Sequence, residues 1–87
     1  MSIIGIDLGS STIKIIEYEN NKILNSKISE SKDYIKVIDD FIKENNINNI
    51  SNFVLTGINA KKVNLNKYNV EKKICRRIYI NRSRRII

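Results

Sequence analysis

The stretch that decides the expected fold runs Ile3-Ile-Gly-Ile-Asp-Leu-Gly-Ser-Ser-Thr-Ile-Lys14. The apolar residues 3–6 are typical of a strand that is covered on both faces. Asp7 then stands at the carboxyl end of that strand, where α/β folds commonly present groups that bind ligands. Residues 9–12 form a short Gly/Ser/Thr turn, and a second strand begins close to Lys14. The stretch therefore predicts a strand, a tight polar loop and a returning strand.

The loop contains the groups that a phosphate site needs. Gly9 lacks a Cβ, so the backbone can turn sharply there and approach a ligand closely. The hydroxyls of residues 10–12 stand beside backbone N–H groups, and both kinds of group donate to phosphate oxygens. Lys14 adds a positive charge, and Asp7 offers an acid to Mg²⁺ or to a metal-bound water. The alternative is an ordinary hairpin with a chance acid at a strand end, because motifs this short produce false positives.

The spacing of apolar residues predicts two further strands joined by a turn. Residues 12–18 and 22–29 alternate in the manner of strands, and Ile23 and Ile28 are the apolar anchors of the second. Asn20-Asn21 lies between them and makes a tight turn, because asparagine tolerates a positive φ. We therefore expect three consecutive strands at the start of the chain.

From Ser31 the apolar period becomes that of a helix, with one face formed by Ile35, Ile38, Phe41 and Ile42. Ser31 or Asp33 caps the start of this helix, and it ends near Asn45-Asn46, because neither asparagine favours a helix interior. Residues 50–56 then form a fourth, apolar strand that leads to Gly57. The predicted fold class is α/β, with the element order β-β-β-α-β.

The charge of the chain changes sharply after residue 60. Residues 1–60 carry six Lys, no Arg and eight acids, whereas residues 61–87 carry five Lys, five Arg and one acid. The formal balances of −2 and +9 together make the net charge of +7. We expect residues 1–60 to form the domain, 61–74 to continue it, and 75–87 to be a basic, irregular tail.

Three interpretations of the basic tail remain open. It is an arm that binds nucleic acid or an anionic membrane, a solvated run of charge, or sequence from a truncated or frame-shifted gene. All arginines of the chain lie between Arg76 and Arg85, after a stretch that uses only lysine. That abrupt change of composition favours the third interpretation.

Two stretches resemble a known family. Residues 4–14 resemble the first phosphate loop of the actin-like ATPase and sugar-kinase superfamily. Phe53-Val-Leu-Thr-Gly-Ile-Asn-Ala60, followed by Val63, Asn66 and Tyr68-Asn-Val70, is similar to the Leu-Thr-Gly-Gly-Asn-Ala region of bacterial type II pantothenate kinases. Ile58 stands where that pattern often has glycine, and residues 61–74 match more weakly. The resemblance covers roughly residues 3–74 and implies the N-terminal part of such a kinase, with a partial ribonuclease-H-like (actin-like ATPase) domain.

The resemblance implies ATP and Mg²⁺ as cofactors and pantothenate as the substrate, which is phosphorylated in the first step of coenzyme A biosynthesis. It also implies that full-length relatives are homodimers. Asp7 would hold Mg²⁺, and Thr56, Gly57 and Asn59 would border the substrate cleft. The nucleotide would be contacted by the whole loop: Asp7, Leu8, Gly9, Ser10, Ser11, Thr12, Ile13 and Lys14.

The same alignment leaves the catalytic step without a residue. The general base of the family would fall near Arg77, and a guanidinium cannot accept a proton because it stays protonated. Glu71 is the nearest acid but lies six residues too early. A second phosphate loop, an adenosine-binding segment and a second domain are also missing, and phosphoryl transfer needs the nucleotide and acceptor clamped in line. We therefore expect no kinase activity from this chain alone.

Two alternatives remain, one from the same superfamily with a different chemistry and one from another functional class. The first is an ATPase activator of the acyl-CoA dehydratase type, but those relatives use cysteines for an iron–sulfur cluster, and Cys75 is alone here. The second is a small basic module that binds nucleic acid, which we consider unlikely. No apolar run approaches the ~20 residues of a membrane span, and Asp7 interrupts the first apolar stretch. A cytoplasmic protein without a membrane partner is therefore expected.

Overall fold

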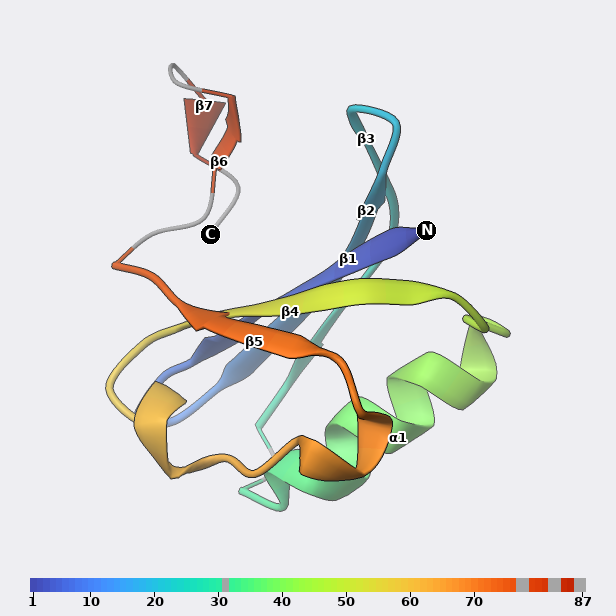
Figure 1. Cartoon of the computed structure of the whole chain (residues 1–87). Coiled ribbons are helices and arrows are strands. Elements are labelled where there is room, and N and C mark those ends of the chain that lie inside the picture. The colour runs from blue at the N-terminus through green and yellow to red at the C-terminus, as the bar shows by residue number, and fades with distance from the viewer. Residues whose placement is uncertain (31, 77–78, 82–83, 86–87) are drawn as a thin grey trace.

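A computed structural model describes residues 1–30, 32–76, 79–81 and 84–85 of the chain (Figure 1). The first five elements run β-β-β-α-β, and three short strands and two 3-10 helices follow them. In chain order the elements are β1 (Ser2–Leu8), β2 (Ile13–Glu19), β3 (Lys22–Ser29), α1 (Tyr34–Glu44), β4 (Ile50–Thr56), η1 (Ala60–Lys62), η2 (Asn66–Tyr68), β5 (Glu71–Ile74), β6 (Tyr79–Asn81) and β7 (Arg84–Arg85).

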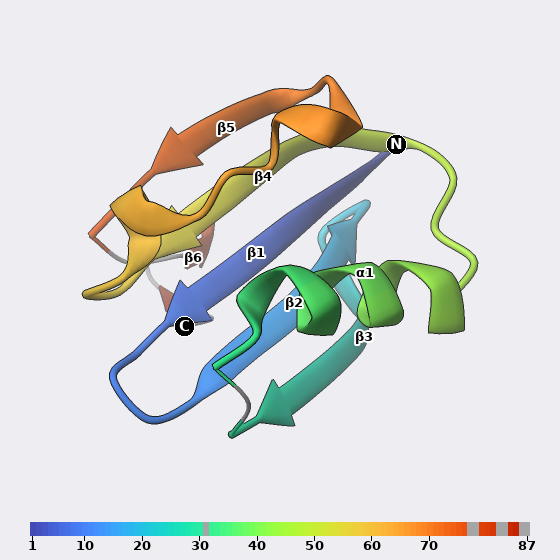
Figure 2. The ribbon, with the colours of Figure 1, turned by 90° about the horizontal axis from the view of Figure 1, so that it is seen from below.

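The first five strands form one mixed sheet in the order β3-β2-β1-β4-β5. β1 pairs antiparallel with β2 and parallel with β4, so the first strand of the chain is the central strand of the sheet. β5 extends the sheet by pairing parallel with β4. The carboxyl ends of β1, β4 and β5 therefore lie at the same end of the sheet, next to the loop between β1 and β2 (Figure 2).

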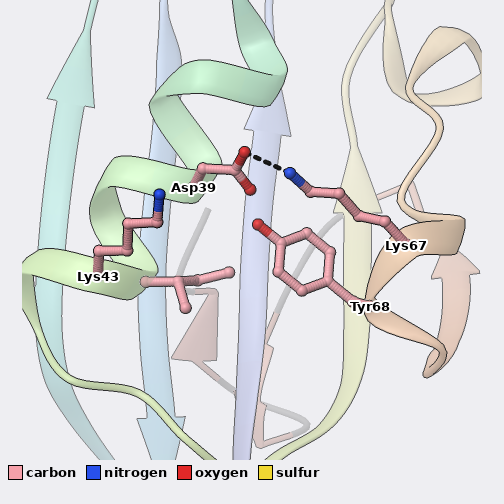
Figure 3. Close-up of a pocket in the computed structure, with 5 residues that line it drawn as sticks. Asp39, Lys43, Lys67 and Tyr68 are labelled. Atoms are coloured by element: carbon pink, nitrogen blue, oxygen red, sulfur yellow. Dashed lines mark hydrogen bonds and ion pairs between the residues drawn. The ribbon is translucent and has the colours of Figure 1, made fainter.

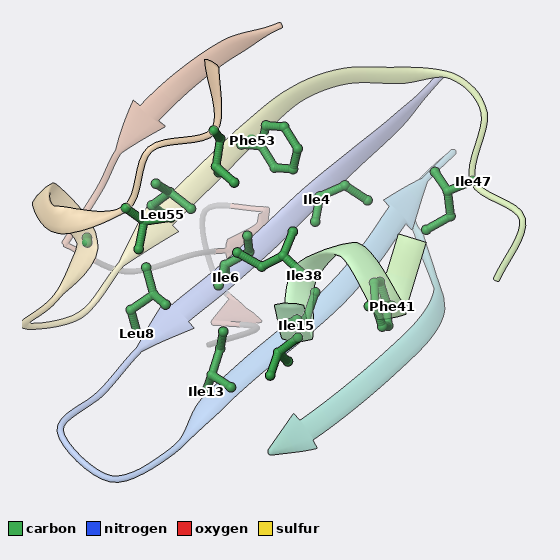
Figure 4. Packing of buried hydrophobic residues seen from close by; sticks show 14 residues of the cluster. Ile4, Ile6, Leu8, Ile13, Ile15, Ile38, Phe41, Ile47, Phe53 and Leu55 are labelled. Atoms are coloured by element: carbon green, nitrogen blue, oxygen red, sulfur yellow. The ribbon is translucent and has the colours of Figure 1, made fainter. Parts of the chain in front are cut away.

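α1 and the η1–η2 segment cover one side of this sheet, which we call the helix face (Figure 2). Because side chains alternate along a strand, every second residue of β1, β2 and β4 points to this face. The residues that pack there form the hydrophobic core shown in Figure 4, and they include Ile4, Ile6, Leu8, Ile13, Ile15, Phe53 and Leu55. Val37, Ile38 and Phe41 of α1 complete the core from the other side.

α1 begins and ends where the sequence predicts. The side chain of Asp33 caps the helix by accepting a hydrogen bond from the Lys36 N–H, which decides between the two candidate caps. Asn45 stands at the C-cap, and its side-chain amide donates to the carbonyl of Phe41 at 2.9 Å. Neither α1 nor the two 3-10 helices of the described chain has the length and apolar character that a membrane crossing requires.

The opposite side of the sheet, which we call the far face, carries Ile3, Asp7, Lys14, Ile28, Val54 and Thr56. The prediction that Ile23 and Ile28 anchor β3 is wrong, because both are exposed, Ile28 to 67%. β3 is an edge strand, and Ile28 lies opposite Lys14 on the far face, away from α1. The predicted turn before β3 is confirmed, because Asn20 and Asn21 both have positive φ.

The segment after β4 differs from the expectation. β5 was not predicted, because Glu71, Lys72 and Lys73 have low strand propensity and show no apolar alternation. The tail was expected to be irregular, but β6 and β7 pair as a short antiparallel ribbon on the far-face side of the sheet (Figures 1 and 2). Tyr79 and Ile80 belong to residue types that favour strands, which accounts for β6.

Candidate functional site

The candidate site lies where β1, β2 and β4 meet at the loop end of the sheet. Asp7, next to last in β1, has Lys14 of β2 as its partner on one side and Thr56 of β4 on the other. Residues paired in this way point to the same side of a sheet, so all three stand on the far face. The sequence-predicted acid and lysine are therefore neighbours, although six residues separate them along the chain.

Neither charged group of this pair is committed to another residue of the described chain. The Asp7 carboxylate is half-buried and takes part in no hydrogen bond or ion pair there. Lys14 is exposed and likewise unpaired within the described residues, and its ammonium does not reach Asp7. A half-buried carboxylate without a donor is costly unless water or a cation satisfies it.

The residues of the β1–β2 loop divide into anchors and free groups. Leu8 and Ile13 are fully buried in the core, so they can offer only backbone atoms to a ligand. Gly9 donates its N–H to the carbonyl of Thr12 at 3.0 Å, which closes the base of the loop. Ser10 and Ser11 at the tip are exposed, and their hydroxyls bond to no residue that the structure describes. The tip of the loop therefore faces solvent, and the hydroxyls of Ser10 and Ser11 remain available to a ligand.

The turn after β4 lies against the end of β1. Gly57 has a φ of +99°, and a Cβ built on it would lie 2.7 Å from Asp7 Oδ1 and 2.6 Å from the Leu8 carbonyl oxygen. Only glycine fits this contact and this backbone conformation. Ile58, which stands where the family pattern often has a second glycine, is 74% exposed. The predicted residue Gly57 is thus next to the predicted metal ligand Asp7.

The other two predicted cleft residues direct their polar groups to the protein. The Thr56 hydroxyl is buried and donates to the carbonyl oxygen of Arg76 at 2.7 Å. The Asn59 amide donates to the carbonyl of Gly9 at 3.0 Å and to the hydroxyl of Tyr34 at 2.9 Å. Tyr34 was not predicted as a site residue, because nothing in the sequence distinguishes it from the other partly apolar residues of the helix.

The predicted location of the general base, near Arg77, lies outside the described residues. Glu71, the nearest acid in the sequence, lies in β5 opposite Asn52 of β4. Asp7 is opposite Thr56, four residues further along β4, which places Glu71 roughly 13 Å from it along the sheet. Glu71 is therefore not part of the site.

A single carboxylate agrees with the way Mg²⁺ is usually bound beside phosphates. The described residues contain no cluster of three or more His, Cys, Asp or Glu that could hold a metal by itself. Mg²⁺ keeps several waters and commonly takes only one or two protein carboxylates together with phosphate oxygens. Asp7, whose carboxylate oxygens bond to no other described residue, fits that role.

A shallow groove of about 210 Å³ lies elsewhere, between α1 and η2 (Figure 3). It is lined by Asp39, Ile42, Lys43, Lys67 and Tyr68. The ammonium of Lys67 pairs with the Asp39 carboxylate at 2.5 Å and stands 5.3 Å from the centre of the Tyr68 ring. These groups satisfy one another and attach η2 to α1, so we place the functional site at the β1–β2 loop instead.

No protein-family model matches the sequence, and no curated protein matches it either. Solved structures share its fold. The activator of the 2-hydroxyisocaproyl-CoA dehydratase from Clostridium difficile, with bound ADPNP, has a TM-score of 0.67 and 17% identity, and the match covers 85% of this chain and 29% of the activator.

Two further structures are similar. A putative N-acetylmannosamine kinase from Listeria monocytogenes has a TM-score of 0.61 and 14% identity, covering 85% of this chain and 34% of the kinase. A ROK family protein from Streptococcus pneumoniae, in complex with sucrose, has a TM-score of 0.60 and 16% identity over the same shares. The chain thus spans about a third of the length of each. At these identities the likeness establishes the fold alone: the chain shares part of the fold of these three proteins.

Proposed function

We propose that residues 7–14 are the first phosphate loop of an ATP-binding protein and that they bind the phosphates of MgATP. The observation that carries this proposal is the uncommitted pair of Asp7 and Lys14, adjacent on the far face beside an exposed Ser10-Ser11 tip. A structural ion pair would join the two charges, and a structural turn would use the serine hydroxyls. That these charges and hydroxyls bond to no other described residue supports a role in binding a ligand.

The residues divide the work of holding a triphosphate. Ser10 and Ser11 donate from hydroxyl and backbone N–H groups to phosphate oxygens, and Lys14 neutralises part of their charge. Asp7 holds Mg²⁺, directly or through a bound water, and the metal supplies further neutralisation of the phosphate oxygens. Leu8 and Ile13 keep the two ends of the loop fixed in the core. Rigid ends matter because phosphoryl transfer depends on position and charge stabilisation more than on covalent participation by the protein.

We further propose pantothenate as the acceptor in the complete protein. The similarity of residues 53–60 to the type II pantothenate kinases supports this choice, and Thr56, Gly57 and Asn59 of that stretch all lie at the loop end of β4. In the transfer, the acceptor hydroxyl oxygen would bond to the γ-phosphorus of ATP. The bond between the γ-phosphorus and the β,γ-bridging oxygen would break, ADP would leave, and a base would take the hydroxyl proton. No carboxylate within the described part of this chain is placed for that last role, so we expect no turnover by these residues alone.

Nucleotide binding by the 87-residue chain tests the first proposal. Isothermal titration with MgATP should give an affinity that falls about tenfold in Asp7→Asn and about tenfold in Lys14→Met, because each variant removes one charge–phosphate or charge–metal contact. Two matched controls change the same charges elsewhere: Glu30→Gln and Lys22→Met are both exposed positions. Equal affinity in all five proteins, or no MgATP binding by the wild type, would refute the proposal.

An ATPase of the dehydratase-activator type is the second candidate, and the TM-score of 0.67 with the ADPNP-bound activator supports it at the level of fold. Both candidates share the nucleotide site and differ in the acceptor. Pantothenate titrated into ¹⁵N-labelled protein with MgATP present should shift the amide signals of residues 56–59 if the kinase proposal is right. Saturating pantothenate that leaves those signals unchanged would favour the ATPase.

A further inference from the structure

The side chain of Asn59 joins three parts of the chain that are far apart in sequence. Its amide nitrogen donates to the Gly9 carbonyl in the β1–β2 loop, 50 residues away, and to the Tyr34 hydroxyl at the start of α1, 25 residues away. Its backbone N–H also donates to the carbonyl of Leu8 at 3.0 Å. One residue therefore holds two consecutive carbonyls at the exact point where β1 enters the loop.

The donor to the Gly9 carbonyl comes from Asn59 and not from the loop itself. In a closed β-turn the carbonyl of Gly9 would accept from the N–H three residues later, at Thr12. Here the only bond that the described residues donate to the Gly9 carbonyl comes from Asn59, while Gly9 N–H donates to the Thr12 carbonyl. A carbonyl can only accept, so the nitrogen and not the oxygen of the Asn59 amide must face it. Asn59 thus supplies the donor that the Thr12 N–H would supply in such a turn.

The same contact orients the N–H that follows. A trans peptide is planar and directs its C=O and its N–H to opposite sides, and the described residues contain no cis peptide. The Gly9 carbonyl points to the Asn59 amide, which is itself bonded to Tyr34 of α1, so the N–H of Ser10 points away from that amide. Asp7 and Lys14 stand on that side, because they belong to the far face.

Both ends of this contact are firmly placed. Asn59 follows Gly57, whose close approach to Leu8 leaves no room for a side chain, and it precedes the buried Ala60. Tyr34 is partly buried and packs against the hydrophobic core. Asn59 therefore links the loop to the end of β1 through its backbone N–H and to α1 through its amide.

We infer that Asn59, anchored by Tyr34, is a positioning residue that holds the Gly9 carbonyl of the β1–β2 loop and thereby directs the Ser10 N–H toward the bound phosphates. The inference rests on the proposed function, because it assigns the held conformation to phosphate binding. It changes the expected role of Asn59 from a contact with the acceptor to a contact with the loop.

Two variants of the full chain test this role. Asn59→Asp replaces the amide nitrogen by an oxygen that repels the Gly9 carbonyl, and Tyr34→Phe removes the anchoring hydroxyl while keeping the ring. Asn64→Asp is the matched control, because Asn64 is exposed and uses only its side-chain oxygen, which accepts from the Asn66 N–H. Ile47→Val is the stability control, since it loosens the core at the end of the sheet away from the loop (Figure 4).

Two readouts are needed: the amide signals of residues 9–11 in ¹H–¹⁵N spectra without ligand, and the affinity for MgATP. We expect Asn59→Asp to move the loop signals and to weaken MgATP binding about tenfold, a factor that corresponds to ~1.4 kcal/mol. Tyr34→Phe should do the same more weakly. Asn64→Asp and Ile47→Val should change neither, even where Ile47→Val lowers the melting temperature as much as Asn59→Asp does.

The outcomes separate this inference from the proposed function. Loop signals and affinity that stay unchanged in Asn59→Asp and in Tyr34→Phe would overturn the inference while leaving MgATP binding intact. A wild-type chain that fails to bind MgATP would refute the proposed function. It would also refute the claim that Asn59 positions the loop for phosphate binding. If Asn59→Asp does not fold, Tyr34→Phe alone decides, because its ring still packs against the core.

Discussion

The two faces of the sheet use the same strands for different purposes. On the helix face, alternate residues of β1, β2 and β4 are fully buried against α1. On the far face, Ile16 and Thr56 are buried, whereas Asp7 is half-buried, Lys14 is exposed and Ile28 of the edge strand β3 is largely exposed. The comparison teaches that most of the buried apolar side chains lie on the helix face, and that the charged groups of Asp7 and Lys14 stand on the other face, outside the hydrophobic core.

The largest test of this comparison removes a ring from the helix face. Phe41 is 1% exposed, and Phe41→Ala should lower the free energy of unfolding by about 3–5 kcal/mol, since it removes apolar contacts and leaves a cavity. Ile28→Ala on the far face should change it by no more than about 0.5 kcal/mol. Urea unfolding followed by circular dichroism measures both. Similar losses at the two positions would show that the far face is also buried in solution.

Gly57 tests the end of β1, where the turn after β4 packs against both Leu8 of the helix face and Asp7 of the far face. Gly57→Ala should cost about 2 kcal/mol, since the new Cβ would meet the Leu8 carbonyl in a backbone conformation that suits only glycine. Gly9→Ala is the milder comparison, with a Cβ 3.1 Å from the Thr12 carbonyl oxygen and no positive φ. Thermal unfolding measures the difference, and a Gly9 variant less stable than the Gly57 variant would contradict it.

Glu17 sharpens the comparison, because it is a carboxylate on the helix face. It is 7% exposed and accepts hydrogen bonds of 2.7 Å from the Ser2 hydroxyl and from the Asn25 amide. Glu17→Leu should lower the free energy of unfolding by about 1–3 kcal/mol, because both donors lose their acceptor. Glu17→Gln keeps one acceptor oxygen and should cost less. A Leu variant more stable than the wild type would mean that these hydrogen bonds make no net contribution to the free energy of unfolding.

The smallest effect is expected on the outer surface of α1, where neither face is involved. A hydrogen bond of 2.7 Å from Lys36 lowers the pKa of Asp40 and raises that of Lys36. A lowered acid pKa stabilises the folded state above the ordinary pKa of the acid, and this contribution is lost as pH falls through the lowered value. Asp40→Asn should therefore reduce stability slightly at neutral pH and leave it unchanged in strong acid. Melting curves at both pH values measure this, and an equal loss at each would contradict the electrostatic cause.

Most of the fold could be predicted from short-range patterns. The strand 22–29, the strand 50–56 and the helix near residue 34 follow from apolar period, capping and turn chemistry, which act within a few residues. β5 could not be predicted, because Glu71, Lys72 and Lys73 pair with β4 through backbone groups that every residue carries. The exposure of Ile28 was missed for a related reason: a sequence pattern does not tell whether a strand lies at an edge.

The candidate site divides in the same way. The sequence by itself predicted the loop and suggested the chemistry that we propose, since Asp7, Ser10, Ser11 and Lys14 are close along the chain and their types suit phosphate and Mg²⁺. Only the tertiary structure decided what Asn59 and Thr56 do, because their partners Gly9, Tyr34 and Arg76 are 20 to 50 residues away. Hydrogen bonds over such separations depend on how strand ends and α1 come together, and residue types alone do not record that arrangement.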